Sequence, residues 1–255
     1  MIFTILIFAI IVIFAIYSFT KLKSKPASIF PKHWHELLIK HVLFYKMLTV
    51  EKQMIFQRRI MQFLSEVYIE GVDIEIEELD KILIAVSAVI PVFGFREWRY
   101  NNLSGILLYP DAFNEDLEFE DQAHSKIIAG LVGTGRFEKQ MILSKKALYS
   151  GFENNNDTYN TGIHEFVHLI DKMDGITDGV PERLIEHPYV IPWLKLIHKE
   201  MEAINDNKSD IRNYGGTNEA EFFAVASEYF FEQPGLMQEK HPELYRMLVA
   251  CFHKN

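Results

Sequence analysis

The chain has 255 residues, of which 49% are hydrophobic and 24% are charged, a composition that suits one sizeable folded domain with an appendage. Its formal net charge of −9 argues against nucleic-acid binding, because contact with phosphates requires a basic face. The lone cysteine, Cys251, excludes an intramolecular disulfide and an all-cysteine zinc site, so a bound metal would need His, Asp or Glu ligands.

The first twenty residues, MIFTILIFAIIVIFAIYSFT, contain no charged side chain. A helix of this length spans roughly 30 Å, the thickness of the hydrocarbon core of a bilayer. The basic residue and the small-residue cleavage site that mark a signal peptide are both missing. We therefore expect residues 1–20 to form a retained transmembrane helix. Lys21, Lys23 and Lys25 follow at once, and positive residues stay on the cytoplasmic side. The soluble part of this single-pass protein is thus expected to face the cytoplasm.

A proline-containing linker over 21–32 leads into a domain that is predicted over 33–255. Apolar residues spaced by three and four are typical of amphipathic helices, and Thr49 is a suitable N-cap for one of them. The helices expected on this basis cover residues 37–46, 51–68, 77–89, 182–204, 218–232 and 242–252.

Strands are expected to be few and short. The sequence ILLY at 106–109 is one, ended by Pro110, and the acidic segment 114–121 is predicted to be an exposed loop. The glycines of GLVGTG hint at a phosphate loop, but no GK[ST] follows, so two strands joined by a glycine turn explain 126–144 better. The strand at 140–144 is expected to lie nearest the helix that contains the sequence HEFVH. Many helices with a small sheet predict an α+β fold.

The segment TGIHEFVHLIDKMDG, residues 161–175, carries the strongest chemical signal. Residues four apart on a helix lie on one face, so His164 and His168 can direct two imidazoles at one point. That supplies half of a tetrahedral zinc site. Glu165 lies about 100° round the helix, where it can reach a metal-bound water without being a ligand itself.

This arrangement is typical of zinc hydrolases. Zinc lowers the pKa of its bound water to about 7, and Glu165 is expected to accept a proton from that water and pass it to the leaving amine. The alternative is a pair of surface histidines without metal, but the apolar residues around them favour a buried helix. A second group, His33, His35 and His41, is not expected to bind metal, because helical positions six apart diverge by about 240°.

A catalytic zinc site usually has three protein ligands and an open position for water. No H-x-x-G-x-x-H pattern continues the motif, so a carboxylate is expected as the third ligand. The candidates are Glu219, Glu221 and Glu228 in NEAEFFAVASEYFFEQP. Glu221 and Glu228 share a helix face among aromatic residues, where a carboxylate is costly unless it is paired or metal-bound. Glu219 can serve as a first-turn acid, and spacing alone does not choose between the other two.

Several longer segments point to one family. They are IHEFVHLID, the Gly-Val-Pro at 179–181, Tyr214 with NEAEFFAVASEYFF after it, VSAVIPVFGF, ILLYPDAF and the glycine-turn strand. Through them the chain resembles the Mlc titration factor A family of zinc metallopeptidases. The similarity extends from Trp34 to Leu248, nearly all of the predicted domain, and it is far more specific than HExxH alone.

The resemblance implies a role for each matching residue. His164 and His168 match the zinc-binding histidines of the family, Glu165 its general base, and Glu221 its third ligand.

Two roles are open for each of three further residues. Glu228 either orients a ligand histidine or serves structurally. Tyr214 matches a tyrosine that either donates a hydrogen bond to the oxyanion of the tetrahedral intermediate or simply packs. Asp171 is either an acceptor behind a ligand or an aspartate on the helix surface.

The resemblance also implies a fold similar to the lethal-factor type of zinc peptidase, with a small sheet whose edge strand holds an extended peptide above the HExxH helix. We therefore expect a membrane-anchored, cytoplasm-facing zinc peptidase that acts on peptides or proteins. The family implies aminopeptidase-like cleavage, although the residues leave exo- and endo-cleavage open. The alternative is a protein that sequesters a transcriptional regulator, with peptidase activity secondary. The best-known form of the family is cytosolic, with the repressor Mlc as its partner, whereas this chain begins with an apparent anchor.

Overall fold

The computed structural model describes residues 29–111, 130–132, 139–153 and 157–253. The anchor expected over 1–20 and the acidic loop expected over 114–121 lie outside these ranges. Within them, no helix combines the length and the apolar character that a bilayer crossing requires.

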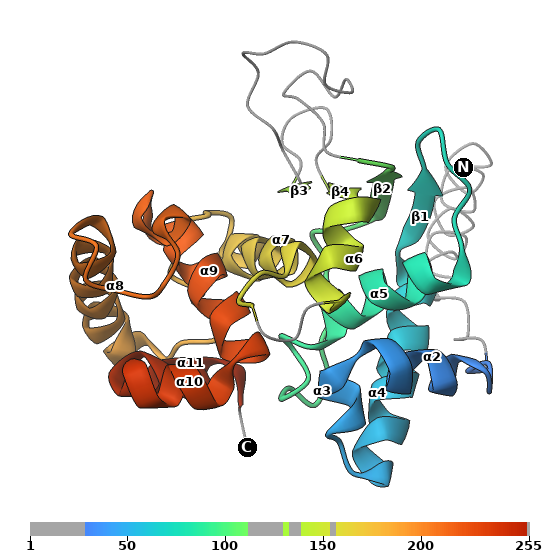
Figure 1. Ribbon diagram of the computed structural model, residues 1–255, viewed down its shortest axis with the longest axis horizontal. Helices are drawn as coiled ribbons and strands as arrows, with labels where there is room; N and C mark the ends of the chain where they lie inside the picture. The colour runs from blue at the N-terminus through green and yellow to red at the C-terminus, as the bar shows by residue number, and fades with distance from the viewer. Residues whose placement is uncertain (1–28, 112–129, 133–138, 154–156, 254–255) are drawn as a thin grey trace, which may run out of the picture.

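Helices form most of the described chain, with a small sheet towards one end (Figure 1). The N-terminal helices are α2 (Trp34–His41), α3 (Leu43–Lys46), α4 (Val50–Glu66) and α5 (Glu78–Val89). The strands are β1 (Tyr68–Gly71), β2 (Gly105–Tyr109), β3 (Gly130–Val132) and β4 (Gln140–Ser144). The later helices are α6 (Lys145–Glu153), α7 (Thr161–Asp171), α8 (Val190–Asn205), α9 (Glu219–Glu232), α10 (Pro234–Lys240) and α11 (Pro242–Phe252). Short 3-10 turns are η2 (Lys172–Asp174), η3 (His187–Tyr189) and η4 (Asn213–Gly216).

The sheet has the strand order β1-β2-β4-β3. Strands β1, β2 and β4 run parallel, with Ile106 of β2 opposite Ile69 of β1 and Met141 of β4. Both central strands lie in the core, since Ile106, Leu108, Met141 and Leu143 are fully buried. Strand β3 runs antiparallel to β4, which is its one strand partner among the described residues. It is therefore an edge strand.

These elements confirm the α+β fold and much of the expected order. The helices expected over 77–89, 218–232 and 242–252 are present as α5, α9 and α11, with ends that differ by one residue at most. Thr49 caps α4 by accepting a hydrogen bond from the backbone N–H of Lys52. The paired strands β3 and β4 agree with the interpretation of 126–144 as two strands.

Other expected elements are wrong in their bounds. The helix expected over 37–46 is divided at Val42, whose extended backbone separates α2 from α3. The helix expected to reach residue 68 stops at Glu66, because Tyr68 pairs with β2 as the first residue of β1. The helix expected over 182–204 begins only at Val190, after the 3-10 turn that holds Pro188.

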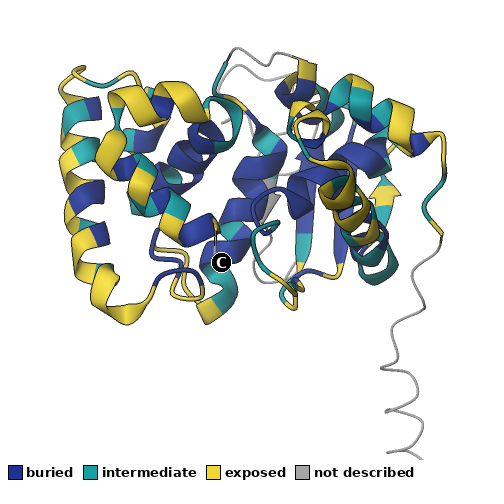
Figure 2. Ribbon diagram, turned by 90° about the horizontal axis from the view of Figure 1, so that it is seen from below, coloured by how far each residue is buried: buried dark blue, intermediate teal, exposed yellow. Residues whose placement is uncertain are grey.

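Neighbouring helices hold α7, the helix of HEFVH, on two sides. Helix α5 crosses it at Gly162, which faces Ser87 so closely that a Cβ has no room there. Helix α9 packs along α7 as well. Phe166 is fully buried on α7 and meets Phe63 and Tyr100 edge-on. Figure 2 shows this interior as a buried region, in dark blue, between more exposed outer helices.

Candidate metal centre

Asn160 begins α7 and thereby sets where the first histidine lies. Its side chain is fully buried, and Oδ1 accepts a hydrogen bond from Ile163 N at 3.0 Å, as an N-cap does. Its Nδ2 donates to Gly151 O and to Glu232 Oε1, both at 2.9 Å. These bonds tie the start of α7 to α6 and to α9, the helix that carries the candidate carboxylates.

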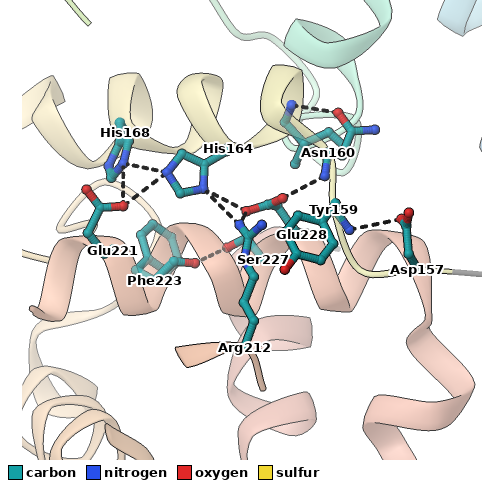
Figure 3. A network of polar contacts seen from close by, with 11 residues as sticks. Asp157, Tyr159, Asn160, His164, His168, Arg212, Glu221, Phe223, Ser227 and Glu228 are labelled. Atoms are coloured by element: carbon teal, nitrogen blue, oxygen red, sulfur yellow. Dashed lines mark hydrogen bonds and ion pairs between the residues drawn. The ribbon is translucent and has the colours of Figure 1, made fainter. Parts of the chain in front are cut away.

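Three side chains from α7 and α9 converge on one point (Figure 3). His164 Nε2 lies 3.0 Å from His168 Nε2 and 3.1 Å from Glu221 Oε2. His168 Nε2 lies 3.4 Å from the same oxygen. Among the described residues, this is the one group of three such side chains whose ligand atoms meet within 4.8 Å. Of the two carboxylates that spacing left open, Glu221 is the one that faces both imidazoles.

The three atoms fit a tetrahedral zinc ion. Ligands about 2.0–2.1 Å from zinc lie roughly 3.3–3.4 Å from one another at tetrahedral angles, close to the separations of 3.0–3.4 Å here. Burial raises the pKa of Glu221, but hydrogen bonds with both histidines outweigh burial and hold it well below the usual range. Burial lowers the pKa of His164, but the carboxylates of Glu228 and Glu221 outweigh burial and raise it to about 10. The site therefore favours positive charge.

Glu228 lies on the other side of the His164 ring. Its Oε1 accepts a hydrogen bond from His164 Nδ1 at 2.6 Å, and its Oε2 accepts one from Asn160 N at 2.6 Å. Arg212 pairs with the same carboxylate and stacks on the ring of Tyr159 at 4.3 Å. A buried acceptor at Nδ1 fixes the orientation of the His164 ring, so that Nε2 is the nitrogen that faces Glu221 and His168.

Glu165 lies beside these three side chains and under the edge of the sheet. It is buried, and burial raises its pKa above the usual value. Strand β3 packs on α7 at this place, and a Cβ added to Gly130 would lie 2.5 Å from Cγ and Oε1 of Glu165. The expectation that 140–144 is the strand nearest this helix is therefore wrong. Strand β3 holds that position because it lies outside β4 at the sheet edge.

Tyr214 precedes α9 and lies next to the histidines. Its ring centroid is 6.0 Å from that of His164, and the residue is 44% exposed, so it is not part of the core. Partial burial and the nearby charge of Glu221 raise the pKa of Tyr214 to about 12. Its phenol therefore keeps its proton and can donate a hydrogen bond at the mouth of the site.

Asp171 is fully buried at the end of α7, which excludes the helix-surface position considered for it. Its Oδ2 accepts a hydrogen bond from Gly179 N at 2.8 Å. Gly179 has a φ of +76°, in the left-handed region that favours glycine. Its carbonyl accepts a hydrogen bond from Trp193 Nε1 at 2.7 Å. The Gly-Val-Pro segment is thus attached to both α7 and α8.

The other acids and histidines singled out in the sequence lie elsewhere. His33 pairs with Glu78, and His35 with the hydroxyl of Tyr45, so that group does not converge on a metal. Glu219 lies in the first turn of α9 and pairs with His198.

Sequence reasoning overlooks three residues of this centre. Asn160 could have been found, because an asparagine directly before an apolar helix is a common N-cap. Gly130 is visible in the sequence only as a residue near a turn. No sequence pattern around Arg212 indicates its role, since it contacts Glu228 only in the folded chain.

Comparison with known families covers almost the whole chain. A family model described as glucose-regulated metallo-peptidase M90 matches residues 18–253, which include every described residue. The chain belongs to this metallopeptidase family. A metal ion and the hydrolysis of peptides are therefore the chemistry of its class.

Individual relatives agree with the M90 assignment. An uncharacterized protein of Synechocystis sp. is 29% identical over 233 residues, or 86% of this chain and 82% of that protein. Mlc titration factor A of Escherichia coli is 29% identical over 221 residues, or 82% of this chain and 78% of that protein. Mlc titration factor A of Cronobacter sakazakii is 32% identical over 183 residues, or 68% and 67% of the two chains. These matches confirm the resemblance that the motifs indicated.

Proposed function

We propose that the chain is a zinc-dependent peptidase whose ion is held by His164, His168 and Glu221, with Glu165 as the general base. The observation that carries the proposal is the meeting of three ligand atoms within 3.0–3.4 Å, with a buried glutamate beside them. Two imidazoles and one carboxylate leave a fourth tetrahedral position open, as catalytic zinc sites do.

The chemistry follows from what each side chain can do. When bound, zinc supplies Lewis acidity that polarises the scissile carbonyl and lowers the pKa of water to about 7. Glu165 takes up a proton at its carboxylate during attack on the carbonyl and releases it to the leaving amine. Burial raises the pKa of Glu165, which makes it a stronger base. Tyr214 keeps its phenolic proton and donates a hydrogen bond to the oxyanion.

Strand β3 offers a place for the peptide main chain. It is an edge strand among the described residues, and its Gly130 lies against Glu165. An extended peptide that pairs with this edge would pass the carboxylate with little dependence on its own side chains. We extend the proposal to aminopeptidase-like cleavage of short peptides, which the family resemblance implies.

We also propose that residues 1–20 hold the chain in a membrane and that the domain faces the cytoplasm. Support comes from twenty residues without charge followed by three lysines within five positions. A cysteine introduced at exposed Lys208 should resist an impermeant maleimide in intact cells and react after lysis. Labelling in intact cells would contradict the topology. The native Cys251 is buried and does not compete for the label.

The name of two of the relatives points to a second kind of role, the binding of a transcriptional regulator. The complete set of His164, Glu165, His168 and Glu221 argues that such binding would accompany hydrolysis and not replace it. The hydrolase is therefore the leading function, and regulator binding is the alternative.

The test compares the purified full chain with Glu165→Gln, and Glu182→Gln changes an exposed glutamate as the matched control. Glu165→Gln should retain bound zinc and lose at least about 100-fold in peptidase activity, because the base is gone and the ligands remain. Glu182→Gln should match the wild type in both measurements.

A panel of peptides with free and acetylated N-termini separates the two modes of cleavage, since an aminopeptidase requires the free amine. Absence of zinc from the wild type, or equal activity in wild type and Glu165→Gln, would overturn the proposal.

A further inference from the structure

The turn between α3 and α4 carries apolar side chains into solvent. Met47 is 79% exposed, Val50 68% and Met54 60%, with Leu43 and Ile55 also exposed beside them. In Figure 1 this turn is the lowest projecting part of the described chain, and Figure 2 views the molecule from that side. Isolated exposed apolar residues are ordinary, but five between positions 43 and 55 at one corner indicate an interaction surface. We call these five residues the α3–α4 corner.

Helix α4 explains why this surface is uncovered. Val50, Met54 and Met61 lie along one stripe of the helix, since they are separated by four and seven residues. Met61 is buried in the core, whereas Val50 and Met54 on the same stripe have no such cover within the described chain. The apolar face of α4 therefore continues beyond the body of the domain.

The segment that contains the corner is basic, although the protein as a whole is acidic. The described residues 29–60 contain six Lys and Arg against two Glu, whereas residues 61–255 contain 17 Lys and Arg against 33 Asp and Glu. These two segments thus carry formal charges of +4 and −16. Lys40, Lys46 and Lys52 are exposed, and none of them forms an ion pair with a carboxylate of the described ranges. Apolar side chains within a basic rim are the chemistry that recognises an anionic lipid surface.

We propose that the α3–α4 corner docks the domain onto an anionic lipid bilayer. Lys46 and Lys52 contact the headgroups, and Met47 and Val50 enter the boundary between headgroups and acyl chains. A second copy of the chain is a poorer occupant, because two basic rims would repel each other. The metal centre stays free, since α7 and α9 lie in a different part of the molecule (Figure 1).

The inference rests on the proposed membrane attachment and adds a second contact to it. Eight residues, 21–28, separate the uncharged N-terminal stretch from Ile29, where the described chain begins. Even fully extended, this connection reaches about 30 Å. Helix α2 follows directly and packs against α3. A chain attached through residues 1–20 therefore has the corner within reach of the bilayer surface.

The test uses the full chain reconstituted into vesicles, with an environment-sensitive fluorophore on Met47→Cys and a quencher carried by the lipid. Ile191→Cys is the matched control, because Ile191 is an apolar residue with 65% exposure on α8, at the opposite end of the molecule. The segment before it is acidic, with five Asp and Glu against two Lys and Arg over 171–190. Vesicles of phosphatidylcholine with phosphatidylserine should quench the label at position 47 severalfold and leave that at 191 unchanged.

A second variant, Lys46→Glu with Lys52→Glu, should reduce the quenching at position 47 by roughly tenfold, because each charge contributes to attraction by the anionic surface. Flotation of the same samples reports membrane attachment separately. Chains that float while the label at 47 stays water-exposed, or is quenched no more than that at 191, would refute docking and leave attachment intact. Chains that do not float would refute both.

Discussion

His164 is held at both nitrogens of its ring. Nε2 faces Glu221 Oε2 at 3.1 Å, while Nδ1 donates to Glu228 Oε1 at 2.6 Å. Arg212 pairs with Glu228, which gives that fully buried carboxylate a partner of opposite charge. A histidine oriented in this way is a better metal ligand, because its tautomer and ring angle are set before the ion arrives.

The first prediction concerns this support. Glu228→Gln should weaken zinc binding by roughly 10–100-fold, the usual cost of removing an acceptor behind a ligand histidine. Competition with a chromophoric chelator measures the affinity. Glu239→Gln changes an exposed glutamate on α10 and should leave zinc binding unchanged. Equal affinities in the two variants would show that Glu228 does not support the ligand.

The second prediction concerns Gly130, which leaves room for the carboxylate of Glu165. A Cβ there would lie 2.5 Å from Cγ and Oε1 of Glu165, so the base has to move. Gly130→Ala should lower kcat by roughly 100-fold, as displacement of a catalytic group by about 1 Å can do, and leave the zinc content unchanged. Gly235→Ala is the matched control, because a Cβ at Gly235 meets no atom within 4 Å. If kcat is the same in both variants, Gly130 does not position the base.

At the scale of elements, α7 and α9 both begin with an asparagine cap. Asn160 bonds Ile163 N on α7, and Asn218 bonds Glu221 N at 2.9 Å on α9. The caps differ in burial, because Asn160 is fully buried and also bonds Gly151 and Glu232, whereas Asn218 is exposed. The start of α7 is therefore held more firmly than that of α9.

This difference predicts unequal effects of one substitution. Asn218→Ala should lower the free energy of unfolding by about 1 kcal/mol, as loss of an exposed cap does. Asn160→Ala should lower it by roughly 2–4 kcal/mol, because buried polar partners are left unsatisfied. Chemical unfolding of the two variants provides the comparison, and equal losses would contradict the role given to Asn160.

His241 connects the C-terminal helices through two carboxylates. Its Nδ1 lies 3.1 Å from Glu200 on α8, and its Nε2 lies 2.7 Å from Asp210. The hydrogen bond with Glu200 is the main cause that raises the pKa of His241, and it outweighs burial. Burial raises the pKa of Asp210, but hydrogen bonds led by that from Lys240 lower it to about 2.

These shifts predict how stability depends on pH. The contribution of His241 is present below its unfolded pKa and is lost as pH rises through its raised folded pKa. The contribution of Asp210 is present above its unfolded pKa and is lost as pH falls towards about 2. His241→Gln should therefore cost roughly 1 kcal/mol more at about pH 6 than at about pH 9, as measured by urea unfolding. His187→Gln, which changes an exposed histidine of η3, is the control. A cost independent of pH for His241→Gln would contradict this account.

The sequence predicted best those helices whose ends carry capping residues. Helix α5 ends at Val89 as expected, and its start is marked by Glu77 and Asp80, which form a capping box. The patterns did not predict β1, because the residues at Tyr68 continue a helical spacing and become a strand only by pairing with β2. They also missed α6 and α10, which are short and lie beside segments rich in turn-forming residues.

At the scale of the whole molecule, the site brings together residues of one helix and residues that are far apart in the sequence. His164, Glu165 and His168 could be predicted from spacing within one helix, because they lie within five residues. The choice of Glu221 over Glu228 could not, since both share one face of α9 and only the packing of α9 on α7 separates their roles. The family resemblance pointed to Glu221 as the third ligand, and the structure shows that this carboxylate faces both histidines. The role of Arg212 could not be predicted either, because it pairs with Glu228 of α9 only in the folded chain.

The central claim is that one zinc ion is held by α7 and α9 together. Anomalous diffraction at the zinc edge, from crystals of the chain grown with zinc, tests it most directly. The account predicts a single strong peak about 2.0–2.2 Å from His164 Nε2, His168 Nε2 and a carboxylate oxygen of Glu221. A map with no peak among these atoms, or with the ion bound by Glu228 in place of Glu221, would contradict it.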